Sequence, residues 1–219
     1  MEQEWMPFII SIKTALTATM ITFFLGIFAA NKINKINPKH KGILDSLFTL
    51  PMVLPPTVIG FFLLVILGRN GFIGKLLYSI GINVIFSWGA TVIAAVVVSF
   101  PLMYSTAKGA FEQIDKNILN AAQTMGVSNF KIFWKIMIPL AWPGIAAGTI
   151  LSFARALGEF GATLMIAGNI PGKTQTIPLA IYFAAEGGDI QGALTWVYTI
   201  FGISLFTMIM MNFWNNYQR

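Results

Sequence analysis

Long stretches without a charged side chain are the feature that most constrains how this chain can fold. A charge at the centre of a bilayer costs about 2.5 kcal/mol or more, and about 20 apolar residues cross the hydrocarbon. A chain whose charges fall between such stretches is therefore suited to cross a membrane repeatedly. The gaps between charges predict five transmembrane helices, at residues 7–30, 46–67, 84–107, 139–166 and 192–213.

The composition agrees with a membrane protein, because 56% of the 219 residues are hydrophobic and only 10% are charged, against about 25% in soluble domains. The chain has no cysteine and a single histidine, His40, which excludes disulfides and thiolate metal sites and leaves little for histidine chemistry. The net charge of +6 is explained by membrane topology, so no nucleic-acid partner is expected. Without linkers or repeats, residues 1–219 are predicted to form one all-α membrane domain.

The basic residues of the loops predict the orientation of the chain. Lysines gather in the loops after the first and third predicted helices, at Lys32, Lys35, Lys39, Lys41, Lys108, Lys116, Lys131 and Lys135. Loops rich in basic residues stay in the cytoplasm, so the N-terminus is predicted outside and the C-terminus inside. The acidic start MEQEW fits this orientation. No signal-peptide pattern is present, so the first helix is expected to stay in the mature chain.

Prolines predict kinks in the predicted helices, and small residues predict close contacts between helices. The prolines are Pro51, Pro55, Pro56 and Pro101. Ordinary helix packing and a kinked wall along a transport path explain them about equally well. Small residues follow one another at a spacing of four, at Gly144, Gly148, Ser152 and Ala156. Such a row lets helix backbones meet closely, either within the chain or between subunits.

A polar interruption follows the third predicted helix. Residues 117–125 are compatible with a short helix, Gly126 suits the left-handed position after a helix end, and Ser128 is a natural N-cap for a second helix that reaches Ile138. Two short helices are therefore expected back to back.

The second of these helices is predicted to have an apolar face. Apolar residues recur at spacings of three and four beside a row of lysines, at Phe130, Phe133, Trp134 and Met137 and at Lys131 and Lys135. Such a helix can lie at the inner leaflet, with its lysines among the headgroups. It can equally dock in a groove of a partner protein, where Ala121, Ala122 and Gly126 permit close approach.

This interruption resembles the Glu-Ala-Ala loop of binding-protein-dependent ABC importer permeases. The shared residues are Ala121, Ala122, Gly126, Ile138, Pro139 and Leu140, while Asn120 stands where the pattern has glutamate. The resemblance implies a type I ABC importer permease architecture with a cytoplasmic coupling helix, in a loop at about 117–138, that seats in a cleft of a separate ATP-hydrolysing subunit. The residues expected at this contact are Asn120, Ala121, Ala122, Gly126, Val127, Phe130, Phe133 and Trp134.

The fourth predicted helix contains a charged pair, Arg155 and Glu159, within apolar sequence. Residues four apart lie on one face of a continuous helix. A self-neutralising structural pair is one explanation. A charge inside the membrane is a functional hypothesis by default, and we favour a pair that faces the dimer interface or the conduction path. The residues assigned to this site are Arg155, Gly158, Glu159, Gly161 and Thr163.

The sequence around this pair is similar to molybdate permeases. The matching segments are residues 155–163, 167–172 and 174–182, together with LPMVLPPTVIGFFLL and GRNGFIGKLL. The resemblance implies the permease subunit of an ATP-driven molybdate importer in a prokaryotic cell membrane, working by alternating access. The implied partners are a second copy of the chain, two ATP-binding cassette subunits that use ATP and Mg²⁺, and an extracytoplasmic molybdate-binding protein. The permease itself is expected to bind no cofactor or metal and to catalyse no reaction.

Several alternatives stand beside this interpretation. Permeases for sulfate, thiosulfate or tungstate are the nearest. A passive anion channel or secondary transporter would leave residues 120–139 without a role, and the chain shows no inverted repeat. An intramembrane enzyme would need a catalytic motif such as H-E-x-x-H or G-x-S-x-G, and neither occurs. The segment AGNIPGKT has the loose form of a phosphate-binding loop, but it follows a predicted transmembrane helix instead of a buried strand, so nucleotide binding is not expected.

Overall fold

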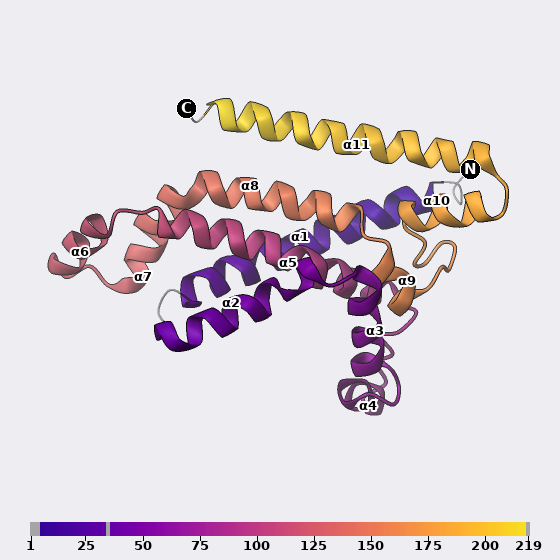
Figure 1. Cartoon of the computed structure of the whole chain (residues 1–219), viewed down its shortest axis with the longest axis horizontal. Coiled ribbons are helices and arrows are strands. Elements are labelled where there is room, and N and C mark those ends of the chain that lie inside the picture. Colours follow the sequence, from indigo (N-terminus) through magenta and orange to yellow (C-terminus); the bar gives the residue numbers. More distant parts are fainter. Residues whose placement is uncertain (1–4, 34–35, 218–219) are drawn as a thin grey trace.

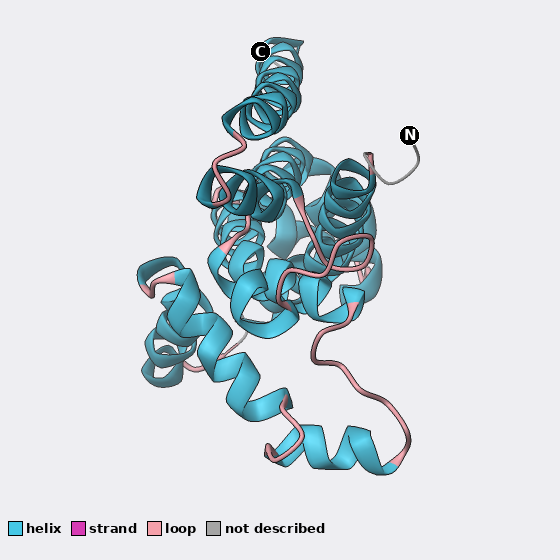
Figure 2. Ribbon diagram, turned by 90° about the vertical axis from the view of Figure 1, so that its right-hand side faces the viewer, coloured by secondary structure: helices cyan, strands magenta, loops and turns pink. Residues whose placement is uncertain are grey.

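The computed structural model describes residues 5–33 and 36–217, and within these ranges the chain is helical with no strand (Figure 2). The helices are α1 Met6–Ile33, α2 Pro38–Val53, α3 Pro56–Leu67, α4 Phe72–Ser79, α5 Trp88–Glu112, α6 Lys116–Thr124, α7 Asn129–Ile132, the π-helical segment η1 Phe133–Met137, α8 Ile138–Leu157, α9 Gly161–Ala167, α10 Ile177–Glu186 and α11 Ile190–Tyr217. Among the described residues, four helices are long and apolar enough to cross a membrane, and one bent pair makes up to five spans. The prediction of an all-α membrane protein with about five spans is confirmed.

Part of the evidence for orientation lies outside the described residues. This applies to the acidic start before Trp5, to Lys35 and to the side chain of Lys39. The orientation of the termini therefore stays a prediction.

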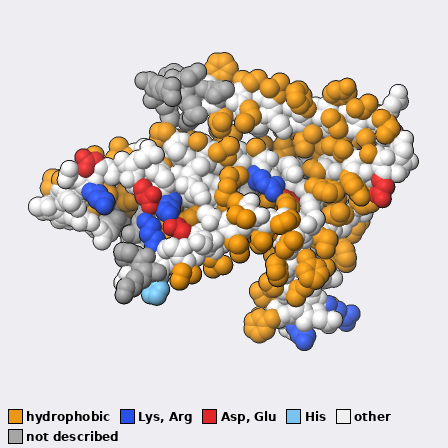
Figure 3. All heavy atoms as spheres, in the orientation of Figure 1, with side chains coloured by type: hydrophobic (Ala, Val, Ile, Leu, Met, Phe, Trp, Pro, Cys, Tyr) orange, Lys and Arg blue, Asp and Glu red, His pale blue; other side chains and the backbone are white. Residues whose placement is uncertain are grey.

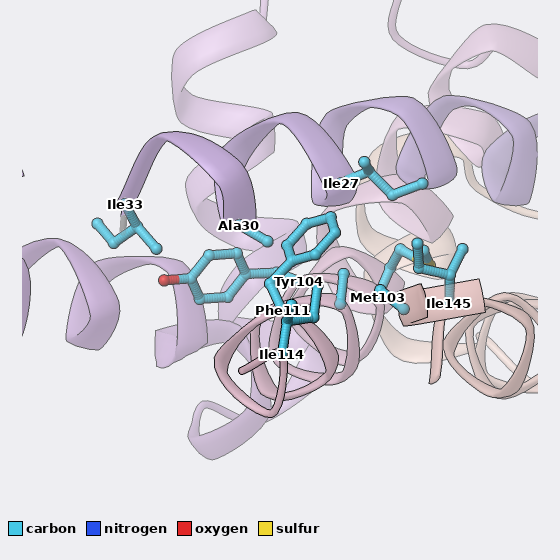
Figure 4. Packing of buried hydrophobic residues seen from close by; sticks show 10 residues of the cluster. Ile27, Ala30, Ile33, Met103, Tyr104, Phe111, Ile114 and Ile145 are labelled. Atoms are coloured by element: carbon cyan, nitrogen blue, oxygen red, sulfur yellow. The ribbon is translucent and has the colours of Figure 1, made fainter. Parts of the chain in front are cut away.

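The centre of the molecule consists of α1, α5 and α8, which lie side by side (Figure 1). α5 is the most buried of the three because it packs against both of the others. Its start is set by Ser87, whose side chain accepts a hydrogen bond from the Ala90 N–H at 3.4 Å. Where the three helices meet, Met103, Tyr104 and Ile145 belong to one buried apolar cluster (Figure 4). This core holds together the parts of α1, α5 and α8 that lie nearer to α6 and α7.

Small residues bring α8 close to α5. A Cβ at Gly144 would lie 2.6 Å from the Cβ of Ala110 and would clash with it, so glycine is required for this close contact. On the same row of α8, the Ser152 hydroxyl donates to the Ser99 carbonyl at 3.4 Å. The row of small residues predicted from the sequence therefore packs against a helix of the same chain.

The second predicted helix is wrong as a continuous span, because α2 and α3 are bent by 112° relative to each other. Proline disfavours helical backbone in the residue before it, so the pair Pro55–Pro56 ends one helix and allows the next to begin in a new direction. Pro55 accordingly has an extended ψ of 136°. Pro51 and Pro101, by contrast, lie inside helices that continue past them.

The fourth predicted helix, 139–166, is wrong at both ends. α8 ends at Leu157, a turn at Gly158 follows, and α9 begins at Gly161. Glycine costs about 1 kcal/mol relative to alanine inside a helix, which favours an end at this point. In the other direction α8 continues through η1 into α7, so that the apolar helix runs over Asn129–Leu157.

Two parts of the chain extend away from the central helices. α11 packs against α10 and part of α8, and its most apolar window has no buried residue (Figure 1). The arm formed by α3 and α4 projects in another direction and is held mainly by α9. Both parts carry exposed aromatic side chains, among them Phe201, Phe206, Phe61 and Phe72. Apolar surface on this scale needs a lipid or protein cover.

Candidate functional site

The predicted coupling segment projects beyond the ends of α5 and α8 (Figure 1). Its first helix, predicted at 117–125, is observed as α6 one residue earlier at each end. α6 begins after Asp115, whose side chain accepts a hydrogen bond from the Asn117 N–H at 2.8 Å and caps the helix. The second helix begins after Ser128 as predicted, although the serine side chain makes no capping bond. It does not end at Ile138, because it continues into α8.

A Schellman turn closes α6. The Gly126 N–H donates to the Gln123 carbonyl at 2.9 Å, and the Val127 N–H donates to the Ala122 carbonyl at 3.1 Å. Gly126 has a φ of +75°, the left-handed conformation that the sequence predicts for it. Side chains, above all β-branched ones, are strained in this conformation, so the direction in which the chain leaves α6 depends on glycine.

The eight residues assigned to the partner contact divide between the surface and the interior of the chain. Asn120, Ala121, Gly126, Phe130 and Trp134 are exposed, Val127 and Phe133 are half-buried, and Ala122 is buried. Phe133 packs against Phe111 of α5, with ring centroids 6.0 Å apart, and so anchors the segment to its own bundle. Phe130 and Trp134 keep 73% and 52% of their surface exposed. The predicted apolar face is therefore used in part by the chain itself, through Phe133, and stays exposed at Phe130 and Trp134.

The π-helical segment η1 joins α7 to α8 and was not predicted. Within it, the Ile138 N–H donates to the Phe133 carbonyl five residues earlier. Pro139 explains the wide turn, because proline has no N–H and its ring would clash with the Lys135 carbonyl four residues before it. π-helical turns inside α-helices occur frequently at functional sites. The signal in the sequence was Pro139, which lies inside the long apolar helix.

The charged pair forms, but not in the predicted way. Arg155 Nη1 lies 2.8 Å from Glu159 Oε2. Glu159 does not lie on a face of α8, since the helix has ended two residues earlier, and its Oε1 accepts a hydrogen bond from the Ala162 N–H at 2.8 Å. The 2% exposed carboxylate thus links the end of α8 to the start of α9, while the Arg155 side chain keeps 32% of its surface exposed.

The other residues assigned to this site lie in the turn and in α9. Gly158 is exposed, whereas Gly161 and Thr163 are buried. A Cβ at Gly161 would lie 3.1 Å from the backbone nitrogen of Thr57, so the start of α9 rests against the start of α3. Arg155 and Gly158 are therefore the members of this set with surface that a passing solute or a second subunit can reach.

An ion-pair cluster between α2 and α5 was missed by sequence analysis. Asp45 lies 2.5 Å from Lys108 Nζ and also accepts a hydrogen bond from the Tyr104 hydroxyl, and Lys41 lies 3.0 Å from Glu112. Acidic and basic side chains lie together toward the end of the molecule that carries α6 (Figure 3). The pairing ties α2 to the central helix. A signal was present, because an acidic residue directly precedes the second predicted span.

The segment AGNIPGKT lies in the connection from α9 to α10. A helix precedes it where a phosphate-binding loop would have a strand. The hydroxyl of Thr174, the last residue of the motif, donates to the Gly168 carbonyl and accepts from the Ile170 N–H, both at 3.0 Å. This hydroxyl is buried and holds the turn closed. The arrangement of a nucleotide-binding loop is not present here.

The bent and broken helices around a three-helix centre, with a helix–turn–helix at one end, have the fold of chains in solved ABC transporters. The solved structure of the inward-facing MetNI methionine ABC transporter matches 96% of this chain and 92% of its own chain, with a TM-score of 0.69 at 13% identity. A bacterial alginate ABC transporter, solved in complex with a periplasmic protein bound to an alginate pentasaccharide, matches 97% of this chain and 78% of its own, with a TM-score of 0.66 at 18% identity. These similarities establish the fold.

Residues 22–216 match the family of binding-protein-dependent transport system inner membrane components, and the chain belongs to this family. It is 49% identical over 199 residues to YvgM of Bacillus subtilis (strain 168), which is named for a molybdenum transport system permease, covering 90% of this chain and 88% of the relative. It is 44% identical over 195 residues to the molybdenum transport system permease protein ModB of Escherichia coli (strain K12), covering 88% of this chain and 85% of the relative. The predicted kinship with importer permeases is confirmed, and the chain is a multi-pass membrane protein.

Proposed function

We infer that two copies of this chain form the transmembrane pathway of an ATP-driven molybdate importer. The observation that carries this function is the α6–Gly126–α7 segment, which projects from the bundle and presents exposed Phe130 and Trp134. Helices of this kind dock by placing large apolar anchors in a groove of the partner. In the proposed complex, that groove belongs to a separate ATP-binding cassette subunit, which binds ATP and Mg²⁺.

The substrate follows from the names of the relatives and from energetics. YvgM and ModB are named for molybdenum transport. Moving one charge against a potential costs about 2.3 kcal/mol per 100 mV, so a dianion entering an inside-negative cell needs near 5 kcal/mol before any concentration gradient. An energy source is therefore required, and the chain itself has no nucleotide-binding arrangement at AGNIPGKT. Sulfate and tungstate have the same charge and shape and are the competing substrates.

The proposed orientation places α6 and α7 in the cytoplasm, the N-terminus outside and the C-terminus inside. Lysines in the loops around these helices support it. An extracytoplasmic binding protein would then deliver the anion at the opposite end of the bundle. The open faces of α11 and of the α3–α4 arm support a second subunit, because one chain of four or five spans does not enclose a path by itself.

Reconstitution of the chain in vesicles with its ATPase subunits and binding protein tests this function. Uptake of molybdate is expected only when both ATP and the binding protein are supplied, and excess tungstate or sulfate measures the selectivity. Uptake that persists without the ATPase subunits would instead identify a passive channel or secondary transporter.

A further inference from the structure

Arg155 borders a hollow on the surface of the membrane-embedded part. Arg155 is the basic residue in the last turn of α8. The hollow measures about 170 Å³ and lies between this turn, the α2–α3 bend and the middle of α5. Arg155 is the one charged residue among the described residues that line it.

The guanidinium keeps donors free for a ligand. Arginine carries five N–H donors, and its ion pair with Glu159 runs through Nη1. Glu159 is itself fixed by the Ala162 N–H and is 2% exposed, so it stays on the protein side of the pair while the arginine side chain reaches the surface. The remaining N–H groups suit an oxyanion, because a guanidinium binds the oxygens of such anions with two parallel hydrogen bonds.

The walls of the hollow suit weak, transient binding of an anion more than tight binding. Pro51, Pro56, Val98 and Leu102 offer apolar surface, and the two prolines have no N–H to donate. At about 30 Å³ for each water molecule, a volume of about 170 Å³ corresponds to about six waters, enough for an anion with four oxygens. A single arginine among apolar walls binds weakly, and a transport path requires sites that are entered and left easily.

The hollow is also connected to the coupling end of the molecule. α2 carries Asp45, which is paired with Lys108 of α5, and two turns later it carries Pro51 at the wall of the hollow. A displacement of α2 relative to α5 would change both places together. The shape of the hollow is therefore tied to the position of the helices that lead into the coupling segment.

We propose that Arg155 and this hollow form a transient binding site for the transported tetrahedral oxyanion, in which the guanidinium nitrogens that are not paired with Glu159 donate hydrogen bonds to the anion. The proposal rests on the proposed import function and names a contact on its path. The anion passes between the α2–α3 bend and the end of α8 without a covalent step.

The first test compares Arg155→Gln with Lys13→Gln in the complete reconstituted transporter. Lys13 is the basic residue of α1 that stacks on the Trp88 ring at 4.3 Å and does not line the hollow. Arg155→Gln is expected to lower molybdate uptake about tenfold or more, the scale of one lost hydrogen bond to a charged group, while ATP hydrolysis stimulated by the binding protein continues. Lys13→Gln is expected to transport like the wild type. Wild-type uptake by Arg155→Gln would overturn the proposal.

The second test keeps Arg155 and decides the question if Arg155→Gln does not assemble. Because the chain has no cysteine, Leu102→Cys introduces a single thiol at the wall of the hollow, and Ser105→Cys on the same helix borders a different cavity. The thiols are labelled with an anionic reagent, and a bound ligand slows labelling by a factor of one plus the ratio of its concentration to Kd. Sodium molybdate at about twice Kd is therefore expected to slow labelling at position 102 about threefold. Labelling at position 105 is expected to stay unchanged.

The outcomes separate this site from the proposed function. A Leu102→Cys thiol that is unprotected or unreachable, in a complex that still imports molybdate with ATP, would overturn the site alone. Failure of the wild-type complex to import molybdate would overturn the proposed function itself.

Discussion

Gly126 has a strict conformational requirement that a single substitution can test. Among the described residues other than its two chain neighbours, no heavy atom lies within 4 Å of the place where its Cβ would be, so the φ of +75° is what opposes a side chain. Left-handed backbone costs L residues about 1–2 kcal/mol, which corresponds to about tenfold in an equilibrium constant. Gly126→Val is therefore expected to distort the turn and to lower co-purification of the ATPase subunit about tenfold.

Gly126→Asn is the matched control, because asparagine tolerates the left-handed region better than valine. It is expected to retain most of the ATPase subunit. Equal losses for both variants would show that any side chain at this surface interferes with docking. Full retention by the valine variant would contradict the role assigned to the turn.

Asp45 allows a second prediction for a single residue. Its carboxylate holds Lys108 and Tyr104 of α5, and the Asp45 and Lys108 side chains are 24% and 21% exposed. Because solvent screens such a pair in part, Asp45→Asn is expected to cost about 1–2 kcal/mol, less than a fully buried pair would. This lowers Tm by about 2–8 °C for a chain of this size, measured by thermal unfolding in detergent.

The more exposed pair in the same cluster supplies the comparison. Glu112 and its partner Lys41 are 46% and 31% exposed, so Glu112→Gln is expected to cost less than about 1 kcal/mol. Equal shifts of Tm for Asp45→Asn and Glu112→Gln would show that the contact between α2 and α5 does not depend on Asp45.

For the elements, the π-helical turn links the coupling segment to α8. Pro139 prevents a regular helix at this point, and η1 inserts one extra residue into the turn before it. Pro139→Ala is expected to restore α-helical geometry and to rotate α7 relative to α8 by about 100°, the angle of one residue. Phe130 and Trp134 would then face a different direction, and co-purification of the ATPase subunit is expected to fall.

Pro143→Ala is the control for this prediction, since Pro143 lies inside regular α8. It is expected to leave the partner contact intact. An ATPase subunit that co-purifies equally well with both variants would show that the π-helical turn does not orient the segment.

Local patterns predicted the elements better than the way they are joined. Gly126 and the start of α6 could be foreseen because a turn and a cap depend on a few neighbouring residues. The 112° bend at Pro55 could be foreseen only as a kink, because its angle depends on how α3 packs against α9. The break after Leu157 was hidden because an apolar sequence continues through it. Glu159 was assigned to a helix face when it in fact caps the next helix.

For the whole molecule, α5 connects the parts proposed to work together. It carries Lys108 at the end beside the coupling segment and Val98 at the wall of the hollow, and it packs against α1, α2 and α8 along the way. In the proposed mechanism, force applied at α6 and α7 would reach the hollow through α5 and through α2, which is paired to α5 by Asp45 and Lys108. If a separate ATPase subunit drives transport through α6 and α7, these helices must face the cytoplasm, where ATP is hydrolysed.

This orientation can be measured with single thiols in a chain that has no cysteine of its own. Gln123→Cys places one on exposed α6, and Lys173→Cys places one in the exposed connection between α9 and α10. In intact cells stripped of any outer barrier, a membrane-impermeant reagent is expected to label position 173 and to reach position 123 only after the membrane is opened. Labelling of position 123 from outside would contradict the proposed contact with the ATPase subunit, because ATP is hydrolysed in the cytoplasm. It would therefore also contradict the proposed import mechanism.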